Sequence, residues 1–409
     1  MTGLEQIRQD AARRFSELGF PTTRNEDWRF TNVAPIAKTQ FQPAPQAARG
    51  SIDGELEQSL VPCGDALRLV FVNGRYSADL STQRLPRGVR AMSLRETNGT
   101  VSRHLARYVS FEHHAFVALN TASFEDGAYV EIANGAVVEE PISLLFVSTG
   151  EDRPVVSHPR SLIVMGPDSQ ATIVESYIGR GGQYFTNAVT EIVAGEHAVV
   201  DHYKVQLEDE TSFHMATMQA QLNRDVNFAT RSFSFGGGLV RNDVNAVLSE
   251  GTQATVDGFY LVSGTQHVDN HTSIDHARPH GTSLELYKGI LEGKSAAVFN
   301  GKIIVRPDAQ KTDAKQTNKN LVLSEDATIN SKPELQIHAD DVRCTHGATI
   351  GQLDRDAIFY LQSRGIAQGR ARDLLTCAFA REIIDRIRVC PLRTRLERTL
   401  SERLHAGLY

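Results

Sequence analysis

The chain has 409 residues, 41% hydrophobic and 22% charged, with a formal net charge of −6. This composition is typical of a soluble globular protein with room for two or three domains, and the negative charge gives no general affinity for nucleic acid or an anionic membrane. Four cysteines are too few for a disulfide framework, the first residues lack a signal-peptide core, and no stretch approaches the ~18 apolar residues of a membrane span, so we expect a cytoplasmic protein.

The N-terminal region is expected to combine a helix with a small hairpin. Apolar residues keep a helical spacing from Leu4 to Leu18, and Gly19 follows as a stop signal. Trp28 is interpreted as an aromatic anchor for this helix, and residues 40–54, rich in Pro, Ala and Gln, as a linker. Asn73-Gly74 between apolar strand residues predicts a tight β-hairpin.

The central region is predicted to be β structure with stacked coils. A short helix is expected after Phe111, then a strand at Tyr129, and up to about residue 345 only short β-favouring runs separated by turn residues follow. A weak echo places an alanine before β-branched residues at positions 171, 198, 254, 296 and 327. This favours a β-solenoid over a sandwich, with the helical ends of the chain as caps.

The C-terminal region is predicted to be helical from Asp354 onward. It is basic, with ten arginines against five acidic residues between Arg364 and Tyr409. A solvated face explains this charge, and a docking surface for an acidic partner is the alternative. The predicted domains are therefore 1–110 (helical with a hairpin), 111–350 (β core) and 351–409 (helical).

The usual catalytic signatures are absent from the sequence, including phosphate loops and nucleophile elbows. One cluster of histidines stands out at residues 267–280. If this stretch begins as a strand, His267, Asp269, His271, Ser273 and Asp275 share one face. That row could bind zinc or iron, or it could form a ladder of hydrogen bonds on the outside of the solenoid.

Cys344 and His346 form a sharper candidate site. In a strand they would point the same way, and thiolate and imidazole are both suitable ligands for iron, zinc or an iron–sulfur cluster. Two ligands do not complete a tetrahedral site. His338 and Asp340 would share the same parity if the strand continues through them, or a second chain would supply the other ligands. The alternative is a buried cysteine beside a structural histidine.

Several segments resemble the SufD branch of the SufB/SufD family, which belongs to the Suf machinery for iron–sulfur clusters. The most specific is Cys344-Thr-His346-Gly-Ala-Thr-Ile-Gly-Gln-Leu, a form that the paralogue SufB is expected to lack. Glu26-Asp-Trp28-Arg-Phe-Thr and His276-Ala-Arg-Pro-His280-Gly-Thr agree with it, so the resemblance runs nearly end to end.

The resemblance implies a right-handed parallel β-helix core with helical N-terminal and C-terminal regions. It implies pairing with a SufB-like paralogue through the β-helix end and docking of a SufC-like ATPase on the C-terminal helices. His346, with Cys344 beside it, would face a SufB cysteine and take part in cluster formation. The iron or cluster would be transient and shared, none would be tightly bound by the lone chain, and the resemblance leaves open whether the lone chain forms a homodimer.

The leading hypothesis is a scaffold subunit without catalytic activity, acting in de novo iron–sulfur cluster assembly and iron acquisition. Two alternatives remain: a protein that binds metal stably through the histidines of 267–280, and a carbohydrate-active enzyme built on a β-helix.

Overall fold

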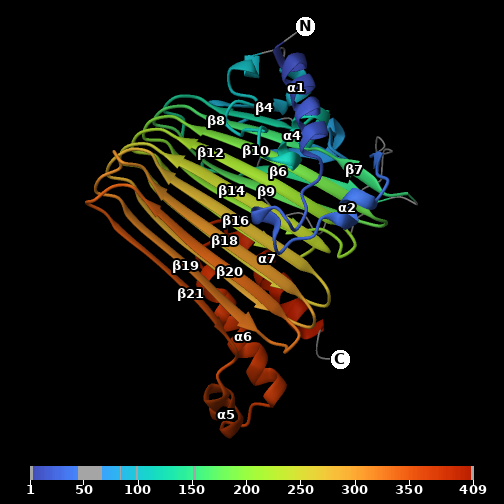
Figure 1. Ribbon diagram of the computed structural model, residues 1–409, viewed down its shortest axis with the longest axis vertical. Helices are drawn as coiled ribbons and strands as arrows, with labels where there is room; N and C mark the ends of the chain where they lie inside the picture. Colours follow the sequence, from blue (N-terminus) through green and yellow to red (C-terminus); the bar gives the residue numbers. More distant parts are fainter. Residues whose placement is uncertain (1–2, 45–66, 83, 98–99, 151–152, 407–409) are drawn as a thin grey trace.

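The computed structural model describes residues 3–44, 67–82, 84–97, 100–150 and 153–406 of the chain. Two long sheets face one another, with helices at both ends of the sequence packed around them (Figure 1). The larger part of the predicted linker at 40–54 lies outside the described residues. No helix among the described residues has both the length and the apolar character needed to cross a membrane.

The strands have the following bounds: β1 Gln42–Pro43, β2 Arg68–Val72, β3 Arg75–Tyr76, β4 Val89–Ser93, β5 Ala128–Ile132, β6 Ile142–Thr149, β7 Val155–Ser157, β8 Arg160–Met165, β9 Gln170–Arg180, β10 Tyr184–Ala194, β11 Val199–Leu207, β12 Phe213–Leu222, β13 Asn227–Ser234, β14 Leu239–Leu248, β15 Gln253–Val262, β16 His267–His276, β17 Thr282–Leu291, β18 Ala296–Val305, β19 Asp313–Val322, β20 Thr328–Ile337 and β21 Arg343–Gly351. The helices are α1 Gly3–Leu18, α2 Ala34–Lys38, α4 Ala115–Ser123, α5 Arg355–Ser363, α6 Gln368–Ile384 and α7 Cys390–Ala406.

Successive strands alternate between the two sheets, so each pair of strands forms one coil of a parallel β-helix. One sheet (sheet A) has the order β20-β18-β16-β14-β12-β10-β8-β5-β4, and the other (sheet B) has the order β21-β19-β17-β15-β13-β11-β9-β6-β2-β3. All neighbours from β5 and β6 onward are parallel. The predicted mainly β fold with a stacked β core is confirmed.

The alanine echo was irregular because it mixed the two sheets. The register partners Phe228 and Ala254 are 26 residues apart and Ser283 and Ala314 are 31 apart, which is the length of one coil. Ala254 lies in sheet B, whereas Ala296, 42 residues later, lies in sheet A. That interval is therefore one and a half coils.

The local predictions for the N-terminal region are largely confirmed. Helix α1 ends at Leu18, and Gly19 adopts a left-handed φ of +62°. Strands β2 and β3 form the predicted antiparallel hairpin, with Asn73 and Gly74 both at positive φ. Strand β4 belongs to sheet A and strand β2 to sheet B, although both lie in the region predicted as N-terminal. The domain boundaries themselves stay a prediction.

The C-terminal helices do not cap the end of the stack, and that part of the prediction is wrong. Helices α6 and α7 lie against the outer face of sheet B, behind the sheets in Figure 1. There Ile383, Leu392 and Leu396 pack in one apolar cluster with Tyr203 and Phe233 of the sheet. Because the outer face of this sheet is itself apolar, it must be covered, and helices α6 and α7 cover it.

Candidate metal site at the open end of the β-helix

The last coil of the β-helix is open. Strand β20 ends sheet A and β21 ends sheet B, and in the described part of the chain no strand pairs with their free edges. Most side chains on both strands are exposed or half-buried, whereas the preceding coil alternates with buried positions. A free parallel edge presents unpaired N–H and C=O groups, which makes it a template for a further strand or chain.

Cys344 and His346 both face the inner side of this open coil. They lie in register with Ala314 and Gln316, which are buried, while the intervening Lys315 is exposed. The predicted common direction of the two side chains therefore agrees with the register. The His346 residue is exposed, and Cys344 is half-buried against an apolar group that includes Ile303 and Leu335.

The half-burial of Cys344 raises the pKa of its thiol above the ordinary value, and the nearby carboxylate of Asp313 acts in the same direction. A thiol with a raised pKa is a poor nucleophile and releases its proton only when a strong electrophile such as a metal ion binds. In the lone chain Cys344 is therefore not an activated nucleophile.

His338 and Asp340 do not extend the pair, contrary to the parity argument. Strand β20 ends at Ile337, and the chain then turns to the opposite sheet before β21 begins at Arg343. The alternation of facing is therefore broken between these residues and Cys344. Among the described residues, no group of three or more His, Cys, Asp or Glu side chains is arranged to hold a metal ion.

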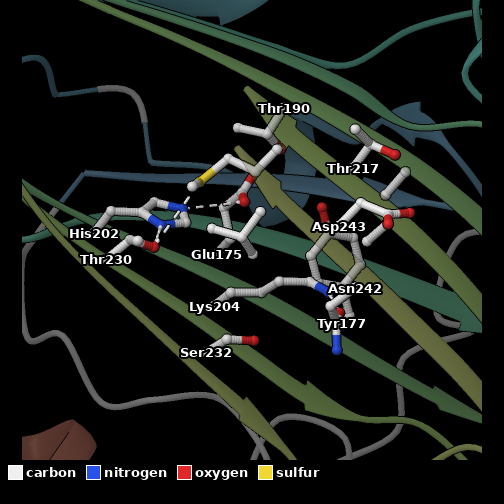
Figure 2. Close-up of a pocket in the computed structure, with 14 residues that line it drawn as sticks. Glu175, Tyr177, Thr190, His202, Lys204, Thr217, Thr230, Ser232, Asn242 and Asp243 are labelled. Carbon is white, nitrogen blue, oxygen red and sulfur yellow. Dashed lines mark hydrogen bonds and ion pairs between the residues drawn. The ribbon is translucent and has the colours of Figure 1, made fainter. Parts of the chain in front are cut away.

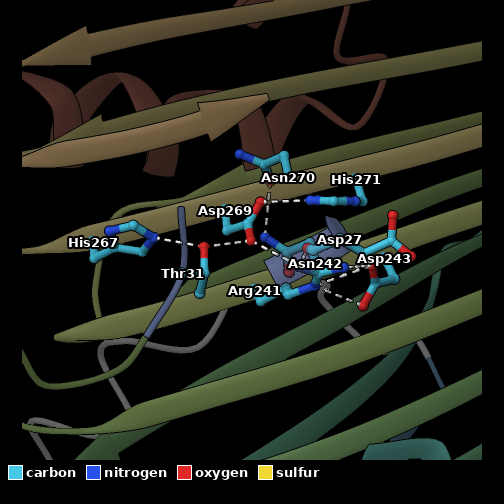
Figure 3. A network of polar contacts seen from close by, with 9 residues as sticks. All are labelled: Asp27, Thr31, Arg241, Asn242, Asp243, His267, Asp269, Asn270 and His271. Atoms are coloured by element: carbon cyan, nitrogen blue, oxygen red, sulfur yellow. Dashed lines mark hydrogen bonds and ion pairs between the residues drawn. The ribbon is translucent and has the colours of Figure 1, made fainter. Parts of the chain in front are cut away.

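The histidine row of 267–275 does form a strand, β16, and its polar side chains are joined in a network (Figure 3). The Asp269 carboxylate accepts a hydrogen bond from Thr31 Oγ1 at 2.6 Å and lies 2.9 Å from Arg241 Nη1. His271 Nε2 lies 3.0 Å from the other Asp269 oxygen, and His267 Nε2 is 2.9 Å from Thr31 Oγ1.

This network holds the N-terminal segment on the outer face of sheet A. Burial alone would raise the pKa of Asp269, but the charges of Arg241 and His271 lower it well below its usual value. The Arg241 guanidinium also lies over the Trp28 ring at 3.8 Å. His267, Asp269 and His271 all have protein partners, which matches the predicted ladder of hydrogen bonds.

A second polar group lies inside the β-helix and was missed by sequence reasoning. Figure 2 shows Glu175, His202 and Lys204 beside a cavity of about 20 Å³ between the sheets. His202 Nε2 is 3.2 Å from a Glu175 oxygen, and Lys204 Nζ is 2.8 Å from His214 Nε2. Burial lowers the pKa of Lys204 to about 8, although the nearby Glu175 and Glu208 oppose the shift. The sequence does show polar and apolar residues alternating along these strands. That alternation does not say which face of a strand lies inside the β-helix.

Helix α5 follows β21 and projects beyond the sheets at the lower end of Figure 1. Its Phe359 is 72% exposed and its Tyr360 is 57% exposed. Part of the C-terminal basic charge has structural partners, because Arg386 pairs with Asp257 at 3.2 Å and Arg403 with Glu210 at 3.3 Å.

Two family models cover most of the chain. Residues 146–379 match the model described as SUF system FeS cluster assembly, SufBD core domain, and residues 1–144 match the SufBD protein N-terminal region.

Relatives with assigned names agree with these matches. An iron–sulfur cluster assembly SufBD family protein of Synechocystis is 37% identical over 96% of this chain and 90% of its own length. The iron–sulfur cluster assembly protein SufD of Escherichia coli is 28% identical over 98% of this chain and 93% of its own. The chloroplastic protein ABCI7 of Arabidopsis thaliana is 30% identical over 94% and 82%. The predicted resemblance is confirmed, and the chain belongs to the SufBD family of the SUF system for iron–sulfur cluster assembly.

Proposed function

We propose that this chain is a non-catalytic scaffold subunit of a SufB–SufC–SufD-like complex that assembles iron–sulfur clusters de novo and takes part in iron acquisition. In this proposal, His346 and Cys344 supply ligands to a nascent cluster shared with a SufB-like partner. The cluster is the cargo of the complex, and the lone chain holds none tightly.

The observation that carries the proposal is the position of the pair on the inner side of an open terminal coil. A thiolate and an imidazole, with no third protein ligand grouped beside them among the described residues, would form half of a tetrahedral site. The free edges of β20 and β21 offer the backbone groups with which a partner could continue the stack. A second copy of this chain could use the same edges when the partner is absent.

The C-terminal helices are proposed to dock a SufC-like ATPase. Helices α6 and α7 are held on sheet B by their apolar faces, whereas α5 projects with two aromatic side chains exposed. Exposed aromatic residues on a rigid helix are typical anchors of protein interfaces.

The experiment is His346→Ala in the chain co-expressed with its SufB-like and SufC-like partners. The exposed His346 carries little packing energy, so we expect the complex to purify intact. Cluster content per complex should fall at least about tenfold, because even outer-shell partners of metal ligands change metal affinity by that much.

Thr345→Ala is the matched control. Thr345 is exposed on the same strand and lies in register with Lys315, so it faces the opposite side from His346. It should retain normal cluster content. Normal clusters in the His346→Ala complex would remove this histidine from the proposed site.

A further inference from the structure

A column of polar side chains runs through sheet B and ends at His346. Register pairing places Glu285 on β17, Gln316 on β19 and His346 on β21 directly beside one another. Parallel in-register neighbours point to the same side of a sheet. Glu285 and Gln316 are 3% and 2% exposed, so the column leads from the interior of the β-helix to its open end.

The amide of Gln316 is held in one orientation. Its Nε2 donates a hydrogen bond to Glu285 Oε2 at 2.8 Å, and above about pH 7, where this carboxyl group is ionised, the carboxylate can only accept. The facing strand provides room at Gly301, where an added Cβ would lie 2.2 Å from Gln316 Nε2. A side chain at position 301 would therefore displace this amide.

The other end of the amide is left without a partner. Gln316 Oε1 is buried, and no described residue donates a hydrogen bond to it. A buried amide oxygen without a hydrogen bond is costly, so such an atom indicates a donor from a neighbouring group. The next residue in the column is His346, whose imidazole carries an N–H donor. In the structure this exposed side chain does not make the bond, and a rotation of the imidazole toward Gln316 would supply it.

We infer that Gln316 is a positioning residue for His346, with its Oε1 accepting the imidazole N–H and Glu285 anchoring the amide from behind. This inference rests on the proposed function, in which His346 is a cluster ligand. A neutral imidazole has one N–H and one lone pair, and the hydrogen bond made by one nitrogen decides which nitrogen is free to bind metal. Gln316 thereby fixes the tautomer and ring orientation before the partner arrives.

The test is the tautomer of His346 in the isolated full-length chain at about pH 8, where Glu285 is ionised, read from the ring nitrogen resonances of protein labelled with 15N-histidine. The His346→Gln variant assigns the signal. We expect one dominant tautomer in the unaltered chain. In Gln316→Met, which keeps the side-chain length, the tautomer ratio should fall about fivefold, the effect of one neutral hydrogen bond, and approach that of the exposed His113.

Glu285→Gln is the second variant. A carboxamide at position 285 can donate to Gln316 Oε1, so the amide is no longer held one way and the same loss of tautomer preference is expected. Gln206→Leu is the matched control, since Gln206 is also a buried glutamine of sheet B that donates to a buried glutamate, Glu208, at 3.1 Å. It should leave the His346 signal unchanged.

An unchanged tautomer ratio in both Gln316→Met and Glu285→Gln would overturn the inference. The measurement uses neither partner nor cluster, so its failure is distinct from failure of the proposed function. Normal cluster assembly by His346→Ala would reject the ligand role of His346, while the nitrogen spectra would still report whether Gln316 orients the ring.

Discussion

The buried acid Glu285 makes the folding stability of this molecule depend on pH. It lies inside the β-helix, and burial raises the pKa of its carboxyl group from 4.5 to about 7. The folded chain therefore binds this proton more tightly than the unfolded chain does. The associated stability is fully present below pH 4.5, falls as the pH rises, and is lost once the pH passes about 7.

Glu285→Gln should remove this dependence. The glutamine has the same shape and no charge, so the unfolding free energy of the variant, relative to that of the unaltered chain, should be about 2.5 kcal/mol higher at pH 8 than at pH 5. Chemical denaturation of both proteins at the two pH values measures the difference. A difference that is constant with pH would show that Glu285 does not titrate in this range.

At the residue scale, the sequence predicts the direction of side chains on the exposed last strand. It misleads about this direction on strands that are covered on both faces. The spacing of two between Cys344 and His346 predicts a common direction in a strand, and their register agrees. Along β11, His202 and Lys204 alternate with Tyr203 and Val205, and period alone would place the apolar pair inside. The reverse holds, because helices α6 and α7 bury the outer face and the polar residues bond to one another within the β-helix.

At the scale of elements, α5 differs from the other C-terminal helices in projecting beyond the sheets (Figure 1). It begins with a well-formed cap, as Asp354 Oδ1 accepts a hydrogen bond from the backbone N–H of Asp356 at 2.8 Å. The helix is thus well defined while Phe359 and Tyr360 remain exposed. This combination suits the docking role proposed for α5.

Phe359→Asp should weaken binding of the SufC-like ATPase by about tenfold or more, as expected for loss of an aromatic anchor at an interface. The thermal unfolding midpoint should stay unchanged because the side chain is 72% exposed. Phe30→Asp is the control, since Phe30 is 45% exposed in the N-terminal region. Titration calorimetry with the purified ATPase distinguishes the two, and equal affinities would place the docking surface elsewhere.

Element types were predictable, but their arrangement was not. Turn chemistry at Gly19 and Asn73-Gly74 specifies local structure within a few residues, so helix α1 and the hairpin followed directly. The placement of α6 and α7 on the side of sheet B depends on which strand faces remain apolar after the coils stack. That property belongs to many strands at once and cannot be read from the helices alone.

At the scale of the whole molecule, the two ends of the stack differ. The sheets finish at one end with strands β3 and β4, which pair antiparallel to their neighbours, and at the other with the parallel strands β20 and β21. A parallel last coil can be continued by a further coil of the same geometry. The polar column through Glu285 and Gln316 reaches the surface at this end, at His346.

In the proposed function, this chain supplies His346 to a cluster held at that open end. The most direct measurement is pulsed electron paramagnetic resonance on a freshly assembled and reduced cluster, in complexes where only this chain carries 15N-histidine. We predict a 15N hyperfine coupling that disappears in His346→Gln and persists in Thr345→Ala. A cluster with full iron content and no coupling to a histidine of this chain would contradict the account.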